Sequence, residues 1–242
     1  MCWFNFESAQ LLRVYGRRMT GDKNESSVTK TRISKKSAAT MSRRERARAD
    51  KRARILSAAA DRLRAQGFER TTVAQVAEDA DVAVGTVFQY AATKAELLMM
   101  VAHEQWATLI SENLARVEAT TEENPELWDD VERMARLVVQ PLVEFALEQP
   151  ENSAAVAREL LFGAEGPHRS SVVVLAAQVE AVIAEVLRRG GRPEGAEAAA
   201  RLIVSGAVLE LNRTRTGLAD AGSVETRLAT LIGVAVAGAA PR

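Results

Sequence analysis

Apolar residues recur along this chain at intervals of three and four positions, the period of one face of an α-helix. The pattern begins near Arg46 and continues almost to the C-terminus. Alternating apolar and polar runs bounded by turn residues, which would indicate strands, are nearly absent, whereas Ala, Leu, Glu and Arg are abundant. The pattern predicts an all-α protein.

Punctuating residues delimit the first helices, which we expect at about 46–66, 73–80 and 84–90, followed by a long helix after Thr93. Gly67 would end the first helix, because a residue without Cβ adopts positive φ at little cost. Thr72 and Thr93 would cap the second and fourth, and Glu96 stands at capping-box spacing from Thr93.

Proline and glycine breaks divide the second half of the chain. The helices expected there are 125–149, 151–162, 170–189, 193–215 and 223–239. Pro125 and Pro193 would stand at helix starts, where a missing N–H is tolerated.

Charge is distributed unevenly, although the 32 basic and 32 acidic residues cancel overall. Before Ile55 there are fifteen Lys or Arg and five Asp or Glu, a net charge of about +10. Two explanations of the basic, Ser- and Thr-rich arm at 1–45 stay open. It could bind a polyanion, or it could be a disordered, solvated tail that an over-long choice of start codon would produce, with Met41 as the alternative start.

Several classes of protein are not expected. No apolar run reaches the ~18 residues of a membrane helix, no signal peptide is evident, and the lone Cys2 allows no disulfide within the chain. A soluble, cytoplasmic protein fits these observations. Nucleotide-binding and catalytic motifs are missing, so neither an enzyme nor a cofactor is expected. His103 and His168 lack ligand-spaced partners, so no metal site is expected, and His168 is predicted to be exposed in a loop.

Residues 67–98 have the proportions of a helix-turn-helix: two short helices joined by a tight turn at Asp81-Val82. The second helix offers small or hydrogen-bonding side chains that could enter a DNA groove without charge repulsion. An ordinary helical hairpin with an uncharged face is the alternative on composition alone. The proposed core of this unit is Val73, Val76, Ala77, Ala80, Val82 and Val87.

This stretch resembles the N-terminal domain of TetR-family (tetracycline-repressor-like) regulators over about 50 residues. The resemblance rests on Gly67-Phe68, Thr71-Thr72, Val76-Ala77, Val82, Gly85-Thr86, Tyr90, Lys94 and Leu97 in order and spacing. It implies an all-α homodimer with three N-terminal helices for DNA, about six more for ligand and dimerisation, and a palindromic operator. The domains implied are the arm at 1–45, a DNA-binding domain at 50–110 with the helix-turn-helix at about 73–92, and an effector-binding and dimerisation domain at 111–242.

By position, the resemblance implies a set of DNA-contacting residues. Gln89 would read a base edge, whereas Tyr90 and Lys94 would fix the position on the phosphate backbone. The full set is Thr71, Thr72, Val73, Val84, Gly85, Thr86, Gln89, Tyr90 and Lys94.

Four positions depart from the family pattern. Asp81 replaces the usual turn Gly, and Ala83 replaces a Ser that would cap the recognition helix. Phe88 and Ala91 replace the usual Tyr and Phe. We expect the fold to survive these changes, with a different set of contacts to the operator.

In this family, large apolar residues of the middle helices line a ligand cavity, although plain core is the alternative for each. The candidates are Trp106, Leu109, Trp128, Met134, Phe145 and Phe162. Small residues in the last two helices, at 198–200, 206–207 and 234–239, would let two subunits form a four-helix interface. Packing within one subunit is the alternative.

The function predicted is a sequence-specific transcriptional repressor that a small molecule of unknown identity releases from DNA. An activator without a ligand and a helical scaffold for protein interactions are the alternatives.

Overall fold

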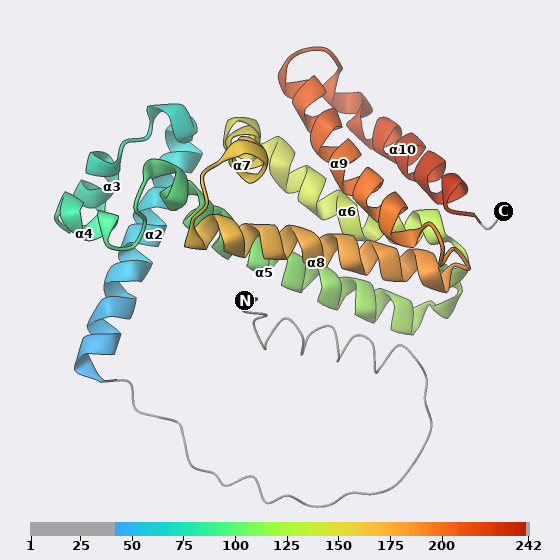
Figure 1. The fold of residues 1–242 in the computed structure, drawn as a ribbon, viewed down its shortest axis with the longest axis horizontal. Helices are drawn as coiled ribbons and strands as arrows, with labels where there is room; N and C mark the ends of the chain where they lie inside the picture. The colour runs from blue at the N-terminus through green and yellow to red at the C-terminus, as the bar shows by residue number, and fades with distance from the viewer. Residues whose placement is uncertain (1–41, 241–242) are drawn as a thin grey trace, which may run out of the picture. The chain divides into compact units, whose positions relative to one another are not determined.

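The computed structural model describes residues 42–240, so the predicted arm before residue 42 lies outside the described part. The described residues form helices and connections without a strand, which confirms the all-α prediction. The elements, shown in Figure 1, are α2 (Arg43–Arg70), α3 (Val73–Asp79), α4 (Val84–Phe88), α5 (Lys94–Glu123), η1 (Pro125–Asp129), α6 (Val131–Glu148), α7 (Pro150–Phe162), α8 (Pro167–Arg189), α9 (Ala196–Arg215), η2 (Ala221–Ser223) and α10 (Val224–Gly238).

Local signals predicted from the sequence are present at the N-terminal helix ends. Gly67 adopts φ +76° and kinks the end of α2. The Thr72 side chain accepts a hydrogen bond from the Gln75 N–H in a capping box at the start of α3. Asp81 has φ +50° in the turn before α4, and the Thr93 hydroxyl accepts from the Glu96 N–H. The positive φ of Gly67, the two caps and the turn at Asp81 are confirmed, but α2 resumes after the kink and ends at Arg70 rather than near Gln66.

Three predictions about helix starts were wrong. The expected helix at 125–149 is divided, because Asp130 ends the 3-10 turn η1 and caps the separate helix α6. The helix expected from residue 170 begins at Pro167, which occupies its first turn. Pro193 lies in a turn, and α9 begins only at Ala196.

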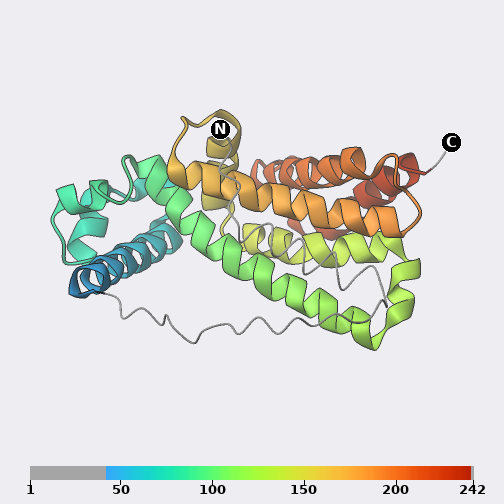
Figure 2. The same cartoon turned by 60° about the horizontal axis from the view of Figure 1, so that its bottom comes forward.

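The buried side chains gather into two clusters. The N-terminal core joins α2, α3, α4 and the first turns of α5 with Ala155 and Val156 of α7 and Val172 of α8. The C-terminal core lies among α5, α6, α8, α9 and α10. Trp106 packs against both clusters. Figure 2 shows α5 running from the α2–α4 group along α8, so this helix physically connects the two cores.

The expectation that no apolar segment is long enough for a membrane helix was wrong for α8. This helix is long and apolar enough to cross a membrane by length and composition, the one such helix among the described residues. About 39% of its apolar window is buried, and it packs against α5, α6 and α9 in the C-terminal core. A core helix passes the same test, so this feature is weak evidence for a membrane segment.

Candidate DNA-binding surface and ligand cavity

The α3–turn–α4 unit is held on α2 by buried apolar side chains. Val76, Ala77 and Val87 are buried against Ile55 of α2. Burial of a side chain such as Val87 contributes roughly 1.5–3 kcal/mol. Because α4 has only five residues, this packing rather than its own hydrogen bonds stabilises it. The expected core is found, although Val73 and Val82 are only partly buried.

An ion pair adds an electrostatic link between α2 and α3. Nε and Nη2 of the Arg62 guanidinium donate to the carboxylate of Asp79, Nη2 at 2.7 Å. This hydrogen bonding lowers the pKa of Asp79. The pair therefore helps to fix α3 on α2.

One face of α4 is exposed and carries no charge. Val84, Gly85, Phe88 and Gln89 are exposed, and a Cβ added to Gly85 would meet nothing within 4 Å. Ala83 offers no side-chain cap, as the departure from the family pattern implied. Phe88 is 46% exposed despite its aromatic ring. This surface can approach the floor of a major groove closely.

Other predicted DNA-contacting residues make internal hydrogen bonds. The Thr71 side chain is buried and its hydroxyl donates to the Gly67 carbonyl at 2.8 Å. The Tyr90 hydroxyl donates to the Arg48 carbonyl at 3.0 Å. The Lys94 ammonium donates to the Glu69 carbonyl at 3.0 Å and lies 4.4 Å from the centroid of the Phe68 ring.

Thr72 and Thr86 complete this surface. Thr72 is exposed, although its hydroxyl oxygen serves the cap of α3, while Thr86 and Val73 are half-buried. The predicted DNA-contacting residues therefore fall into two groups. Those of α4 form an exposed face, whereas Thr71, Tyr90 and Lys94 already make hydrogen bonds within the protein.

Glu96, His168 and Arg169 form a cluster that we call the α8 clamp. It ties the end of α4 and the start of α5 to the C-terminal helices. The buried Glu96 carboxylate accepts from the backbone N–H groups of His168 at 3.0 Å and Arg169 at 3.2 Å. It thereby caps α8, where the helix dipole favours an anion. A Cβ at Gly166 would stand 2.2 Å from the Glu96 Oε1, so this glycine permits the close approach.

The other side chains of the α8 clamp reach α4 and α7. His168 Nε2 lies 2.7 Å from the Tyr90 carbonyl and must donate, because a carbonyl can only accept. The Arg169 guanidinium donates to the carbonyls of Glu159 and Leu160 at the end of α7. The prediction of His168 as an exposed loop residue was wrong, because Pro167 starts α8 early and the ring packs back onto the end of the recognition unit.

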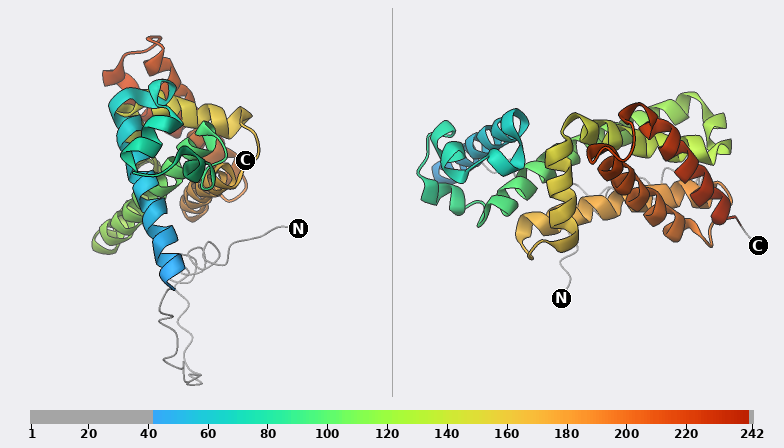
Figure 3. Two further views of the ribbon diagram at one scale, coloured as in Figure 1. Left: turned by 90° about the vertical axis from the view of Figure 1, so that its left-hand side faces the viewer. Right: turned by 90° about the horizontal axis from the view of Figure 1, so that it is seen from above.

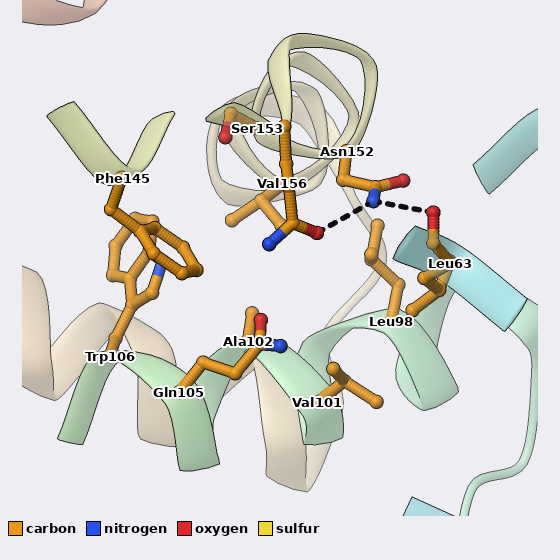
Figure 4. Close-up of a pocket in the computed structure, with 11 residues that line it drawn as sticks. Leu63, Leu98, Val101, Ala102, Gln105, Trp106, Phe145, Asn152, Ser153 and Val156 are labelled. Carbon is orange, nitrogen blue, oxygen red and sulfur yellow. Dashed lines mark hydrogen bonds between the residues drawn. The ribbon is translucent and has the colours of Figure 1, made fainter. Parts of the chain in front are cut away.

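A cavity of about 20 Å³ lies where the two cores meet, between α2, α5, α6 and α7. Trp106 and Phe145 lie against each other at one side, and Leu63 of α2 contributes the other side (Figure 4). Such a volume holds about one water molecule. The remaining lining residues are Leu98, Val101, Ala102, Gln105, Gln149, Asn152, Ser153 and Val156.

Asn152 is one of four polar residues in the lining of this cavity. Its Nδ2 donates to the Leu63 carbonyl at 2.9 Å and to the Gln149 Oε1 at 3.1 Å. Its Oδ1 is buried and has no hydrogen-bond partner among the described residues. A buried unsatisfied acceptor costs about 1–3 kcal/mol, so a group that donates to it would be stabilised here.

The predicted pocket residues do not all meet at this cavity. Trp106 and Phe145 line it, whereas Met134 is fully buried in the C-terminal core. The guanidinium carbon of Arg189 lies over the Trp128 ring, 4.5 Å from the centroid of that ring. Leu109 is half-buried and Phe162 is 83% exposed, both away from the cavity lining. The sequence pattern offered no signal for Asn152, which reads as an ordinary polar position in the first turns of α7.

Large apolar side chains remain exposed on the last two helices. On α9, Leu202 and Leu209 are each 63% exposed, and their spacing of seven places them on one face. Val234 of α10 is 70% exposed. Figure 3 shows α9 and α10 on the far side of α7 from the α2–α4 group.

Several small residues of these helices pack within the subunit, whereas Ala198, Ala237 and Gly238 are exposed. Gly206 lets α10 approach, because a Cβ there would lie 2.1 Å from Leu231 Cδ1. The buried small residues are Ala199, Ala200, Ala207, Ala235 and Ala239.

No group of three His, Cys, Asp or Glu side chains in the described part of the chain could hold a metal ion. His103, the other histidine, is half-buried on α5.

An exposed short helix on a three-helix N-terminal unit, joined to a larger helical domain, has the architecture of a helix-turn-helix protein. Residues 55–100 match the family model described as bacterial regulatory proteins, tetR family. A search of curated proteins finds no match.

Solved structures have the same fold. FadR from Thermus thermophilus, described as a TetR-family transcriptional repressor in complex with lauroyl-CoA, is 23% identical with a TM-score of 0.57, covering 79% of this chain and 96% of that one. FadR from Bacillus subtilis, in complex with stearoyl-CoA, is 18% identical with a TM-score of 0.56, covering 77% and 98%. A TetR transcriptional regulator from Rhodococcus sp. RHA1 is 18% identical with a TM-score of 0.57, covering 78% and 97%.

Residues 55–100 therefore match the N-terminal domain of tetR-family bacterial regulatory proteins, and the chain has the fold of solved TetR-family regulators.

Proposed function

We propose that this regulator is a dimeric repressor that binds a palindromic operator and leaves it when a small molecule opens the cavity between its two cores. The observation that carries the proposal is the position of the cavity, because its wall includes Leu63 of α2. A ligand there would push directly on the DNA-binding unit. Such a protein would work in the bacterial cytoplasm, where the DNA is.

The dimer would form through α9 and α10. The exposed Leu202, Leu209 and Val234 support this surface, since large apolar patches on monomers mark interfaces. A two-fold axis between the subunits would place two α4 helices about one DNA turn, ~34 Å, apart. The domain boundary near residue 110 fits this arrangement, because the C-terminal core takes over along α5 at Ile110.

Release would depend on the contacts that connect the cavity-lining helices to α4. Val101 and Ala102 of α5 and Val156 of α7 line the cavity, and the α8 clamp holds these two helices to the end of α4. A ligand that separates α5 from α7 would therefore change the position of α4. To act as a switch it must bind the two conformations with different affinity.

We propose a ligand with an apolar chain and a polar end that donates a hydrogen bond. The apolar residues of the lining, with the aromatic pair, support the chain, and the unpartnered Oδ1 of the lining residue Asn152 supports the donor. Long-chain acyl-CoA molecules are the first probes, because two proteins of this fold are described in complex with them and the amides of the pantetheine arm supply N–H donors. Because the cavity is only about 20 Å³, such a chain would enter only with displacement of α5, α6 or α7.

Gln89→Ala is expected to abolish selection of one base pair in each half-site. Bidentate side-chain contacts discriminate by about 1–3 kcal/mol, roughly 5- to 150-fold. The purified protein is incubated with random-sequence duplexes at near-physiological salt, and the retained duplexes are sequenced. Gln178→Ala on α8 serves as the control. Failure of the wild type to enrich any palindrome would overturn the repressor proposal and favour a scaffold.

Stearoyl-CoA and lauroyl-CoA are expected to release the selected operator, whereas coenzyme A without an acyl chain is not. Ala102→Leu fills the cavity and should block the response, while overpacking costs about 1–3 kcal/mol of stability. Fluorescence anisotropy of the labelled operator measures release. An equal effect of coenzyme A alone, or an unchanged response of Ala102→Leu, would overturn the ligand proposal.

A further inference from the structure

Helix α2 begins well before the part of the chain that matches the family model. The helix starts at Arg43 and the match starts at Ile55. A capping box fixes this start: the Ser42 hydroxyl accepts from the Glu45 N–H, and the Glu45 carboxylate accepts from the Ser42 N–H. The first three turns of α2 are therefore a specified extension of the DNA-binding domain.

This extension is strongly basic and buries no apolar side chain. Residues 43–54 contain seven Lys or Arg and two Asp or Glu, and their only apolar residues are three alanines. All of these positions except Arg52 are exposed. Packing therefore contributes little to this segment, and repulsion among the cations opposes it.

Three of the cations form what we call the α2 stripe: Arg44, Arg48 and Lys51. Their spacing of four and three puts them on one face of α2, in line with the buried Ile55. No ion pair occupies these three side chains among the described residues, whereas Arg52 pairs with Glu104 and Arg54 with Asp81.

Two hydrogen bonds place the α2 stripe beside the recognition unit. The Tyr90 hydroxyl donates to the Arg48 carbonyl, and the Arg54 guanidinium donates to the Asp81 carbonyl in the turn before α4. Figure 1 shows the N-terminal end of α2 extending past α3 and α4. The α2 stripe thus lies on the helix that contacts both ends of the recognition unit.

We propose that the α2 stripe binds the phosphate backbone of duplex DNA next to the sequence that α4 reads. This inference rests on the proposed DNA-binding function and adds a second, sequence-independent contact. Lys and Arg that neutralise phosphates release condensed counterions, which makes binding depend on salt. A membrane surface is not favoured, because amphipathic membrane helices need large apolar residues opposite their cations and this segment has only alanine.

The test uses the full chain and the series Arg44→Gln, Arg44→Gln/Arg48→Gln, and the triple variant with Lys51→Gln. Glutamine keeps helix propensity close to that of Lys and Arg. Affinity is measured against salt concentration for a random-sequence duplex and for an operator selected from random duplexes, with and without flanking base pairs. Arg116→Gln/Arg133→Gln, exposed positions on α5 and α6, is the matched control for the double variant.

The slope of log affinity against log salt should fall by about 0.9 for each lost contact, so by roughly 2.7 in the triple variant. The loss of affinity should be equal on the operator and on the random duplex. It should vanish when the flanking base pairs are removed, and the control variant should show none. If the triple variant kept the wild-type salt slope on flanked duplexes and still selected the operator, the α2 stripe would not bind phosphates. The proposed function would be unaffected. Absence of operator selection in every protein would instead overturn the proposed function. Wild-type vesicle binding that exceeds duplex binding at equal salt would overturn DNA as the stripe's partner.

Discussion

Leu202→Glu combined with Leu209→Glu is expected to produce a folded monomer that binds its operator about 10²–10⁴-fold more weakly, because two linked recognition helices gain that factor over one. Both leucines are 63% exposed in the single subunit, so the glutamates cost little without a partner. In a symmetric interface the same substitutions bring four carboxylates together across the two-fold axis. The repulsion and the lost apolar burial act in the same direction.

Analytical ultracentrifugation gives the oligomeric state, and anisotropy with the selected operator gives the affinity. Leu161→Glu is the matched control, since this α7 leucine is 67% exposed and lies off the α9–α10 surface. It should remain dimeric and bind as the wild type does. A dimeric double variant with full operator affinity would show that another surface joins the subunits.

The parts of the fold that the sequence predicted correctly depend on contacts within a few residues. Gly67, Thr72 and Asp81 each act on backbone groups no more than four positions away, so their residue types alone determine the turn or cap. The short α4 could be located for the same reason. Its start at Val84 was predicted correctly, whereas its end lies at Phe88, two residues before the predicted one.

Glu96 illustrates what local spacing leaves out. Its position three residues after Thr93 predicted a reciprocal capping box, and the Thr93 hydroxyl does accept from the Glu96 N–H. The carboxylate, however, accepts from His168 and Arg169, more than seventy residues away. A side chain with two possible partners follows the tertiary packing, which no window of sequence contains.

The lining of the cavity, too, could not be predicted from local sequence patterns. Large apolar residues were the natural candidates for its lining, yet Met134 fills the C-terminal core and Phe162 faces solvent. The lining includes Gln105, Gln149 and Asn152, whose polarity favours a surface position when only helix periodicity is considered. On α9 and α10, likewise, small residues serve the contact within the subunit and leave the leucines outside.

Glu96→Ala is expected to destabilise the protein by about 1.5–3 kcal/mol, the worth of hydrogen bonds to a charged group. In a protein of this size that corresponds to a melting temperature lower by roughly 3–12 °C. The substitution leaves the N–H groups of His168 and Arg169 without their acceptor and frees the first turn of α8 from α5. Because His168 also holds the Tyr90 carbonyl, the loss should reach α4 and weaken operator binding as well.

Glu104→Ala on the same helix is the control that separates this role from the general effect of removing a carboxylate. Glu104 pairs with Arg52 at 3.3 Å, and both side chains are about 40% exposed, so the pair is worth at most about 1 kcal/mol. Urea unfolding and operator titration of the two variants measure both effects. If Glu96→Ala matched Glu104→Ala in stability and affinity, the α8 clamp would be an ordinary surface contact. A larger loss in both quantities for Glu96→Ala would instead show that the carboxylate couples the packing of the C-terminal helices to the placement of the recognition helix.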